Sequence, residues 1–138
     1  MDSKISNTKD FLLDLDGTVY LGDELLGDVK NTLKAFRDKG ITLVYLTNNS
    51  SKTDDEYLVK LKNMGIWDDR DIFYSSLDAA IDYLKEYYSG AKVYPMATAR
   101  VIQHLIKSDI DVTEDADVVL ATFDKELNYE KMVKVNEL

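Results

Sequence analysis

The chain has 138 residues, of which 45% are hydrophobic and 31% are charged, a balance typical of one globular domain or slightly more. Its net charge of −9 argues against a nucleic-acid backbone or an anionic membrane as partner, because both attract basic surfaces. The lack of cysteine excludes disulfides, thiolate catalysis and cysteine metal sites. The polar first ten residues do not resemble a signal peptide and no apolar run is long enough to cross a bilayer, so we expect a cytoplasmic protein.

Short apolar segments alternate along the chain with amphipathic ones of helical period. The pattern predicts strands at 11–13, 41–46, 71–74, 92–94 and 118–122, and helices at 27–39, 53–64, 77–88, 98–107 and from 129 onward. The alternation indicates an α/β fold with a parallel sheet. The pattern restarts after Gly90, so we place a domain boundary there, between residues 1–89 and 90–138.

Two aspartates follow the first predicted strand directly. Asp14 and Asp16 flank one leucine, and Gly17 then permits a sharp turn and a close approach to a ligand. Ligands of open α/β sheets bind beyond the carboxyl ends of the strands, where one carboxylate can attack phosphorus while the other moves a proton. A turn with solvated aspartates is the alternative, and the buried strand just before Asp14 favours the functional interpretation.

A cluster of neutral donors follows the second predicted strand. Thr47 and Asn48 begin a run of hydroxyl and amide side chains at the same sheet edge as Asp14. Such groups, with nearby backbone N–H groups, can hold the oxygens of a transferring phosphoryl group. For this cluster alone, a polar loop that leads into the next helix is an equally good interpretation.

The two clusters together resemble the first two motifs of the haloacid dehalogenase (HAD) phosphatases. Asp-Leu-Asp-Gly-Thr-Val-Tyr at 14–20 and Thr-Asn-Asn-Ser-Ser-Lys at 47–52 are similar to the nitrophenylphosphatase and sugar-phosphatase branch, which includes phosphoglycolate and pyridoxal phosphate phosphatases. Residues 123–132 also resemble that branch, within its cap domain. The resemblance implies a Rossmann-like core over residues 1–89, and over 90–138 the start of an inserted α/β cap.

The resemblance also implies roles for individual residues. Asp14 would be the nucleophile that forms an aspartyl-phosphate, and Asp16 would protonate the leaving group and then activate water. Thr47, Asn48 and Gly17 would bind the substrate phosphate. Mg²⁺ would be held by the Asp14 carboxylate and the Asp16 backbone carbonyl, in keeping with its preference for oxygen ligands. The substrate would be a small phosphorylated metabolite.

Two further parts of the family pattern have no match in this sequence. A lysine that neutralises the phosphate and an acidic pair that completes the metal site normally follow the cap, and no Gly-Asp-x-x-x-Asp segment occurs in the 138 residues. We therefore expect the chain to be a truncated, inactive fragment. Without a later strand beside it, the strand at 11–13 would be an apolar edge that favours pairing with a second copy in a homo-oligomer.

Two rival interpretations stay open at this point. A receiver-type phosphoacceptor signalling domain has a suitable length, but it would place its phosphorylated aspartate at a later strand end, where this chain has Thr47 and Ser75. A non-catalytic remnant that only folds or binds is the second rival.

Overall fold

The computed structural model describes residues 7–138, whose contacts divide them into two compact units. The first unit comprises the chain up to Thr47 together with Asp54–Tyr74, and the second comprises Asn48–Thr53 and Ser75–Leu138. The elements mainly in the first unit are β1 (Asp10–Asp14), β2 (Tyr20–Leu21), β3 (Glu24–Leu25), α2 (Val29–Asp38), β4 (Thr42–Thr47), α3 (Asp54–Asn63) and β5 (Ile72–Ser75). Those of the second unit are α4 (Ser76–Tyr87), β6 (Lys92–Met96), α5 (Ala99–Lys107), β7 (Asp111–Val112), β8 (Val118–Ala121) and α6 (Tyr129–Glu137).

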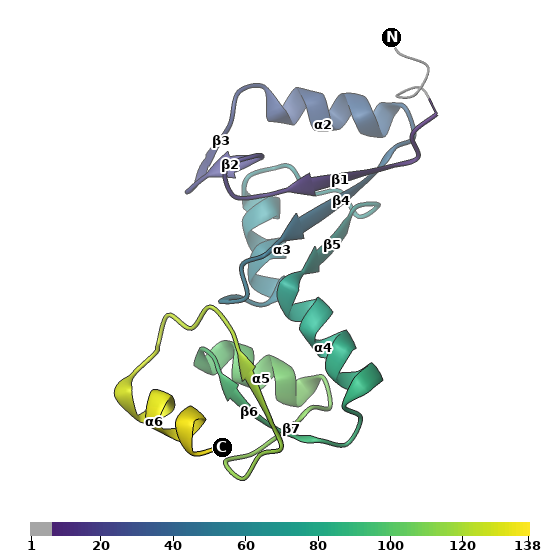
Figure 1. Ribbon diagram of the computed structural model, residues 1–138. Helices are drawn as coiled ribbons and strands as arrows, with labels where there is room; N and C mark the ends of the chain where they lie inside the picture. The colour runs from purple at the N-terminus through teal and green to yellow at the C-terminus, as the bar shows by residue number, and fades with distance from the viewer. Residues whose placement is uncertain (1–6) are drawn as a thin grey trace. The chain divides into compact units, whose positions relative to one another are not determined.

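The first unit is built on a sheet of strand order β1-β4-β5, whose strands run side by side in Figure 1. The pairing of β1 with β4 is parallel and aligns Asp14 with Leu46. Successive crossovers in one direction along such a sheet place their helices on one face, because the crossovers are right-handed. The buried cluster agrees: side chains of α2 and α3 pack with Leu13, Leu43 and Tyr45 of the strands.

The opposite face of this sheet is open in the described residues. Leu12, which alternates with the buried Leu13, is 64% exposed, and Ile72 and Tyr74 of β5 are also exposed. The strand β1 has a neighbour on one side only among residues 7–138. The predicted apolar edge is therefore present, while its effect on self-association stays a prediction.

A network of hydrogen bonds connects α2 to the segment just before β5. The Arg37 guanidinium contacts both carboxylate oxygens of Asp71, and it also donates to the backbone carbonyl of Ile66 at 2.6 Å. The hydroxyl of Tyr45 donates to the same carbonyl at 2.7 Å. The side chains of Arg37 and Asp71 are only 12% and 1% exposed, so each charge depends on the other for compensation.

Replacing Arg37 by methionine is expected to destabilise the fold strongly. Removing one partner leaves the Asp71 carboxylate buried without its counter-ion, which costs about 3–5 kcal/mol in other proteins. Lys34→Met is the matched control on the same helix, because its ion pair with Asp38 is exposed and worth about 0.3–0.5 kcal/mol. Urea unfolding of both variants measures the difference, and equal unfolding midpoints would contradict a structural role for the buried pair.

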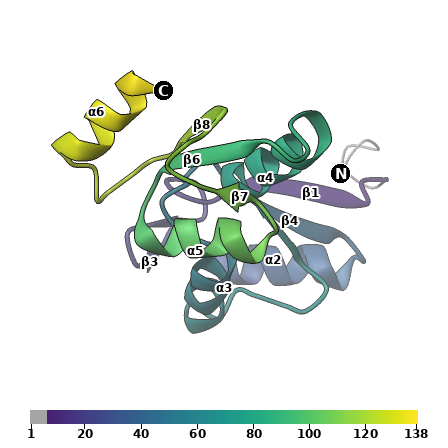
Figure 2. The same cartoon turned by 90° about the horizontal axis from the view of Figure 1, so that it is seen from below.

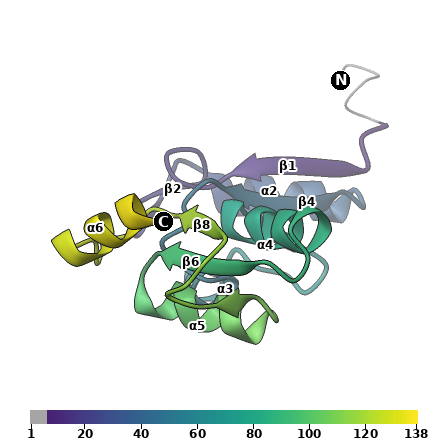
Figure 3. The same cartoon turned by 60° about the horizontal axis from the view of Figure 1, so that its bottom comes forward.

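The second unit is a smaller α/β layer with the strand order β7-β6-β8, in which both pairings are parallel. In Figure 3 the strand β6 runs between α4 and α5, and Figure 2 shows α5 beside β7. Its core joins Leu77, Ile81 and Leu84 of α4 to Val101 and Leu105 of α5. The last helix, α6, buries none of its side chains completely.

The predicted elements agree with the structure, with three differences. The predicted α/β class with parallel sheets is confirmed, and each predicted strand and helix exists within a few residues of its expected bounds. The hairpin β2–β3 and the strand β7 were not predicted, since strands of two residues leave no periodic signal. The helix predicted at 77–88 ends at Tyr87, so Tyr88 lies beyond its last turn and is 45% exposed. The proposed domain boundary near residue 89 stays a prediction.

Candidate active site

The two aspartates lie on the exposed side of the strand end. Leu13 and Leu15 are buried, so the alternation of a strand leaves Asp14 and Asp16 exposed between and beyond them. The chain then folds around the carbonyl oxygen of Leu15, which accepts hydrogen bonds from the N–H groups of Thr18 and Val19 at 3.2 and 2.9 Å. Gly17 has φ +85°, a conformation that favours glycine, and its N–H donates to the Tyr20 carbonyl at 2.7 Å.

This turn brings a hydroxyl onto the first aspartate. The Thr18 hydroxyl donates to Oδ2 of Asp14 at 3.0 Å. Sequence reasoning gave Thr18 no role, although a tight turn after Asp16 makes a contact between residues 14 and 18 reachable. The hydrogen bond fixes one carboxylate oxygen and leaves Oδ1 as the atom available to a ligand.

The Thr47 side chain is placed at the same edge by the register of the sheet. Because Asp14 pairs with Leu46 in parallel register, Thr47 comes one residue beyond that pair, and it is buried. Its hydroxyl is hydrogen-bonded to the hydroxyl of Tyr57 from α3. Burial raises the pKa of Tyr57 and the nearby Asp16 carboxylate adds to the rise, while the Thr47 hydrogen bond opposes it. Asp14, Asp16, Gly17 and Thr47 thus belong to one unit.

The fifth predicted site residue belongs to the second unit. Asn48 follows Thr47 directly in the chain, and its side chain is exposed. Its backbone carbonyl accepts a hydrogen bond from the Ser76 hydroxyl at 2.9 Å. Asn48 therefore contacts Ser76 of the second unit, whereas Thr47 contacts Tyr57 of the first unit.

The hairpin after the turn is held over the buried ring of Tyr20. The ammonium group of Lys60 lies 3.8 Å from the centroid of the Tyr20 ring and donates to the Gly22 carbonyl at 2.7 Å. Burial raises the pKa of Tyr20, and the Asp16 carboxylate raises it further. Tyr20 therefore stays neutral across the physiological range, and its buried side chain lies near Asp16.

The oxygen atoms at this strand end suit a magnesium ion. Within residues 7–138, no three His, Cys, Asp or Glu side chains lie close enough to hold a metal by themselves. Mg²⁺ needs fewer protein ligands than that, because one or two carboxylates, waters and a substrate phosphate commonly complete its octahedron. The Asp14 carboxylate and the backbone carbonyl of Asp16 could supply two such oxygen ligands, and Thr18 engages only one oxygen of Asp14.

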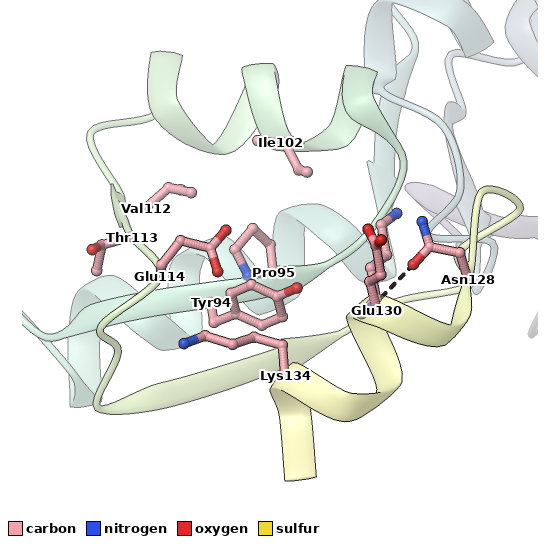
Figure 4. Close-up of a pocket in the computed structure, with 10 residues that line it drawn as sticks. Tyr94, Pro95, Ile102, Val112, Thr113, Glu114, Asn128, Glu130 and Lys134 are labelled. Carbon is pink, nitrogen blue, oxygen red and sulfur yellow. Dashed lines mark hydrogen bonds between the residues drawn. The ribbon is translucent and has the colours of Figure 1, made fainter. Parts of the chain in front are cut away.

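A pocket lies in the second unit. Figure 4 shows Tyr94, Glu114 and Asn128 around a pocket of about 520 Å³. None of the motif residues lines it.

Across the described residues, no helix is long and apolar enough to cross a bilayer.

The fold and the strand-end carboxylates define an α/β protein with an acidic site at the carboxyl edge of a parallel sheet. The family model described as haloacid dehalogenase-like hydrolase matches residues 11–116, so the chain belongs to this family. This membership removes the receiver-domain alternative and confirms the resemblance drawn from the two motifs.

Named relatives agree with the family assignment. The chain is 32% identical to the acid sugar phosphatase of Staphylococcus aureus (strain USA300) over 126 residues. This aligned region covers 90% of this chain and 49% of that protein. The crystal structure of 4-nitrophenylphosphatase from Thermotoga maritima superposes with a TM-score of 0.87 at 29% identity, over 94% of this chain and 50% of that one. NagD from E. coli K-12 gives a TM-score of 0.82 at 26% identity, over 94% and 52% of the two chains. The chain thus spans about half the length of these relatives, two of which are named as phosphatases.

Proposed function

We propose that the protein hydrolyses phosphate monoesters of small metabolites through a phosphoryl group carried on Asp14. The observation that supports this most strongly is the pair of exposed carboxylates at the end of β1, one of them oriented by Thr18, beside the buried Thr47 at the end of β4. The names of the related phosphatases point to sugar phosphates and nitrophenyl phosphate as substrate classes to test. A cytoplasmic location accords with such metabolites and stays a prediction of the sequence.

The chemistry proceeds in two transfers. An Asp14 oxygen attacks phosphorus, the bond from phosphorus to the leaving oxygen breaks, and Asp16 gives its proton to that oxygen. Asp16 then takes a proton from water, which attacks phosphorus, releases inorganic phosphate and restores the Asp14 carboxylate. The Thr18 hydrogen bond to Oδ2 holds the Asp14 carboxylate in one orientation.

Neutral donors would hold the phosphate oxygens during both transfers. The buried Thr47 hydroxyl, which neighbours Tyr57, would be one of these groups. Asn48 would add its side-chain amide and Gly17 its close backbone approach. Mg²⁺, bound by the Asp14 carboxylate and the Asp16 carbonyl, would neutralise charge on the phosphoryl oxygens.

Removal of magnesium tests the metal assignment. A full-length protein carrying this chain should lose p-nitrophenyl phosphatase activity in excess chelator and regain it with Mg²⁺. Ca²⁺ should restore little activity, because it accepts longer and more numerous oxygen contacts than the octahedral Mg²⁺. Turnover that is unchanged in chelator would contradict a metal role for Asp14 and Asp16.

The 138-residue chain on its own is expected to hydrolyse p-nitrophenyl phosphate no faster than its Asp14→Asn variant. Two unit charges ~4 Å apart repel by roughly 4 kcal/mol at an effective dielectric near 20, so a carboxylate and a phosphate dianion need compensating cations. The lysine and the acidic pair that the resemblance assigns to this task have no counterpart in the sequence. Assays of both chains with Mg²⁺, with light scattering to report their mass, check this. Turnover by a monomer that depends on Asp14 would show that residues 1–138 suffice.

A further inference from the structure

The two residues proposed to bind phosphate after β4 are held by different parts of the molecule. Thr47 ends a strand of the first unit, whereas Asn48–Thr53 make their contacts within the second unit. The order of the segment 48–53, and of Asn48 within it, therefore depends on the second unit's own hydrogen bonds.

Three hydrogen bonds of the second unit hold this segment. The Ser76 hydroxyl donates to the Asn48 carbonyl at 2.9 Å, and the Phe123 N–H donates to the Ser50 hydroxyl oxygen at 2.9 Å. The Thr98 hydroxyl donates to the Ser51 carbonyl at 3.4 Å, and both of these residues are buried. The three donors come from the start of α4, the segment after β8 and the start of α5, which are far apart in the sequence.

The segment that supplies the Phe123 N–H is itself fixed by a buried ion pair. The Lys131 ammonium donates to the Asp124 carboxylate at 2.6 Å and to the Ala97 carbonyl at 2.7 Å. The Asp124 side chain is 1% exposed, and its other oxygen accepts the Glu126 N–H at 2.8 Å. The Glu126 carboxylate in turn accepts the N–H of Ala99, the first residue of α5, at 2.8 Å.

Lys131 lies on a helix with no fully buried side chain, yet it forms an ion pair with a buried carboxylate. The Asp124 carboxylate is almost inaccessible, so it depends on the Lys131 ammonium for charge compensation, and loss of that ammonium would leave the charge buried and unpaired. The ordered segment then presents one backbone N–H to Ser50, two residues after Asn48. A continuous chain of contacts thus runs from α6 to the segment that carries Asn48.

We propose that Lys131 and Asp124 are positioning residues for the Asn48-bearing segment, and that phosphate affinity depends on them. The proposal rests on the proposed function for its effect on phosphate binding. Its effect on the order of residues 48–53 does not, because that is a property of the second unit alone.

The test compares three substitutions in the full-length protein. Lys131→Met removes both donated hydrogen bonds, Lys131→Arg keeps a cation that can donate to both acceptors, and Lys134→Met is the control on the same helix. Hydrogen–deuterium exchange, read by mass spectrometry, reports the order of residues 48–53. Inhibition of p-nitrophenyl phosphate turnover by inorganic phosphate reports affinity at the site.

Lys131→Met should raise exchange in residues 48–53 and in 122–126, while β6 keeps its protection. The inhibition constant for phosphate should rise about fivefold, the effect of one ordinary hydrogen bond, with kcat changing less. Lys131→Arg should recover most of both effects, and Lys134→Met should show neither. A uniform rise in exchange across the second unit would indicate a purely structural role and overturn the proposal.

Ser50→Ala provides a second arm in case Lys131→Met does not fold. It removes the acceptor of the Phe123 N–H and leaves the ion pair intact, so exchange should rise in residues 48–53 but not around Asp124. Exchange that stays at the wild-type level in this variant overturns the proposal. So does faster exchange with unchanged phosphate affinity. If the wild-type protein neither turns over nor binds phosphate, the proposed function fails, and the exchange data still decide whether these residues order the segment.

Discussion

Replacement of Asp14 by asparagine in a full-length protein is expected to reduce phosphatase activity to background. The amide has nearly the shape of the carboxylate and can still accept the Thr18 hydrogen bond, so the turn should persist. It cannot act as the nucleophile, and without a covalent intermediate neither transfer takes place. The measurement is kcat for p-nitrophenyl phosphate with Mg²⁺, in variants whose fold is verified by circular dichroism.

Asp10→Asn is the matched control for this prediction. Asp10 is an exposed carboxylate at the opposite end of the same strand, and its loss changes the net charge by the same amount. Activity of this control should stay near that of the wild type. An Asp14→Asn protein with activity within tenfold of wild type would remove Asp14 from the role of nucleophile.

Replacement of Asp16 by asparagine is expected to lower activity by about 10²–10⁴-fold, the usual effect of losing a general acid or base. The loss in kcat/KM should depend on the leaving group. Nitrophenolate is stable without a proton, whereas an alkoxide needs one as the bond breaks. The Asp16→Asn protein should therefore lose more kcat/KM with an alkyl phosphate than with p-nitrophenyl phosphate.

The second transfer gives an independent sign of the same role. Without Asp16 to activate water, the aspartyl-phosphate should break down slowly, so a burst of nitrophenol should precede a slow steady state. Equal losses in kcat/KM for the two leaving groups, without a burst, would contradict acid/base catalysis by Asp16. Such a result would favour a purely electrostatic or structural role for the Asp16 carboxylate.

Much of the fold follows from local signals in the sequence. Runs of three and six residues, at 11–13 and 41–46, predict β1 and β4, and the glycines at 40 and 65 mark the ends of α2 and α3. The hairpin β2–β3 could not be predicted, because its strands of two residues have no periodic pattern and its contact with Lys60 joins residues far apart in the chain. The buried pair of Arg37 and Asp71 is likewise a tertiary contact with no local pattern.

Some features of the candidate site could likewise be predicted from the sequence, and others could not. Parallel strands bring their carboxyl ends to one edge, so the proximity of Asp14 and Thr47 could be predicted from the order of the elements alone. The hydrogen bond from Thr18 depends on the particular turn around Leu15, and the support of Thr47 by Tyr57 depends on how α3 packs. The contacts of the Asn48 segment with Phe123 and Ser76 join residues far apart in sequence, which motif spacing does not reveal.

The central claim is that Asp14 carries the phosphoryl group, and trapping that intermediate tests it most directly. A full-length protein turning over p-nitrophenyl phosphate with Mg²⁺ would be quenched in acid, digested and analysed by mass spectrometry. The account predicts the added mass of one phosphoryl group on the peptide containing Asp14, its removal by hydroxylamine, its accumulation in Asp16→Asn and its absence from Asp14→Asn. Turnover with the phosphoryl group on another residue, or with none trapped even in Asp16→Asn, would contradict the account.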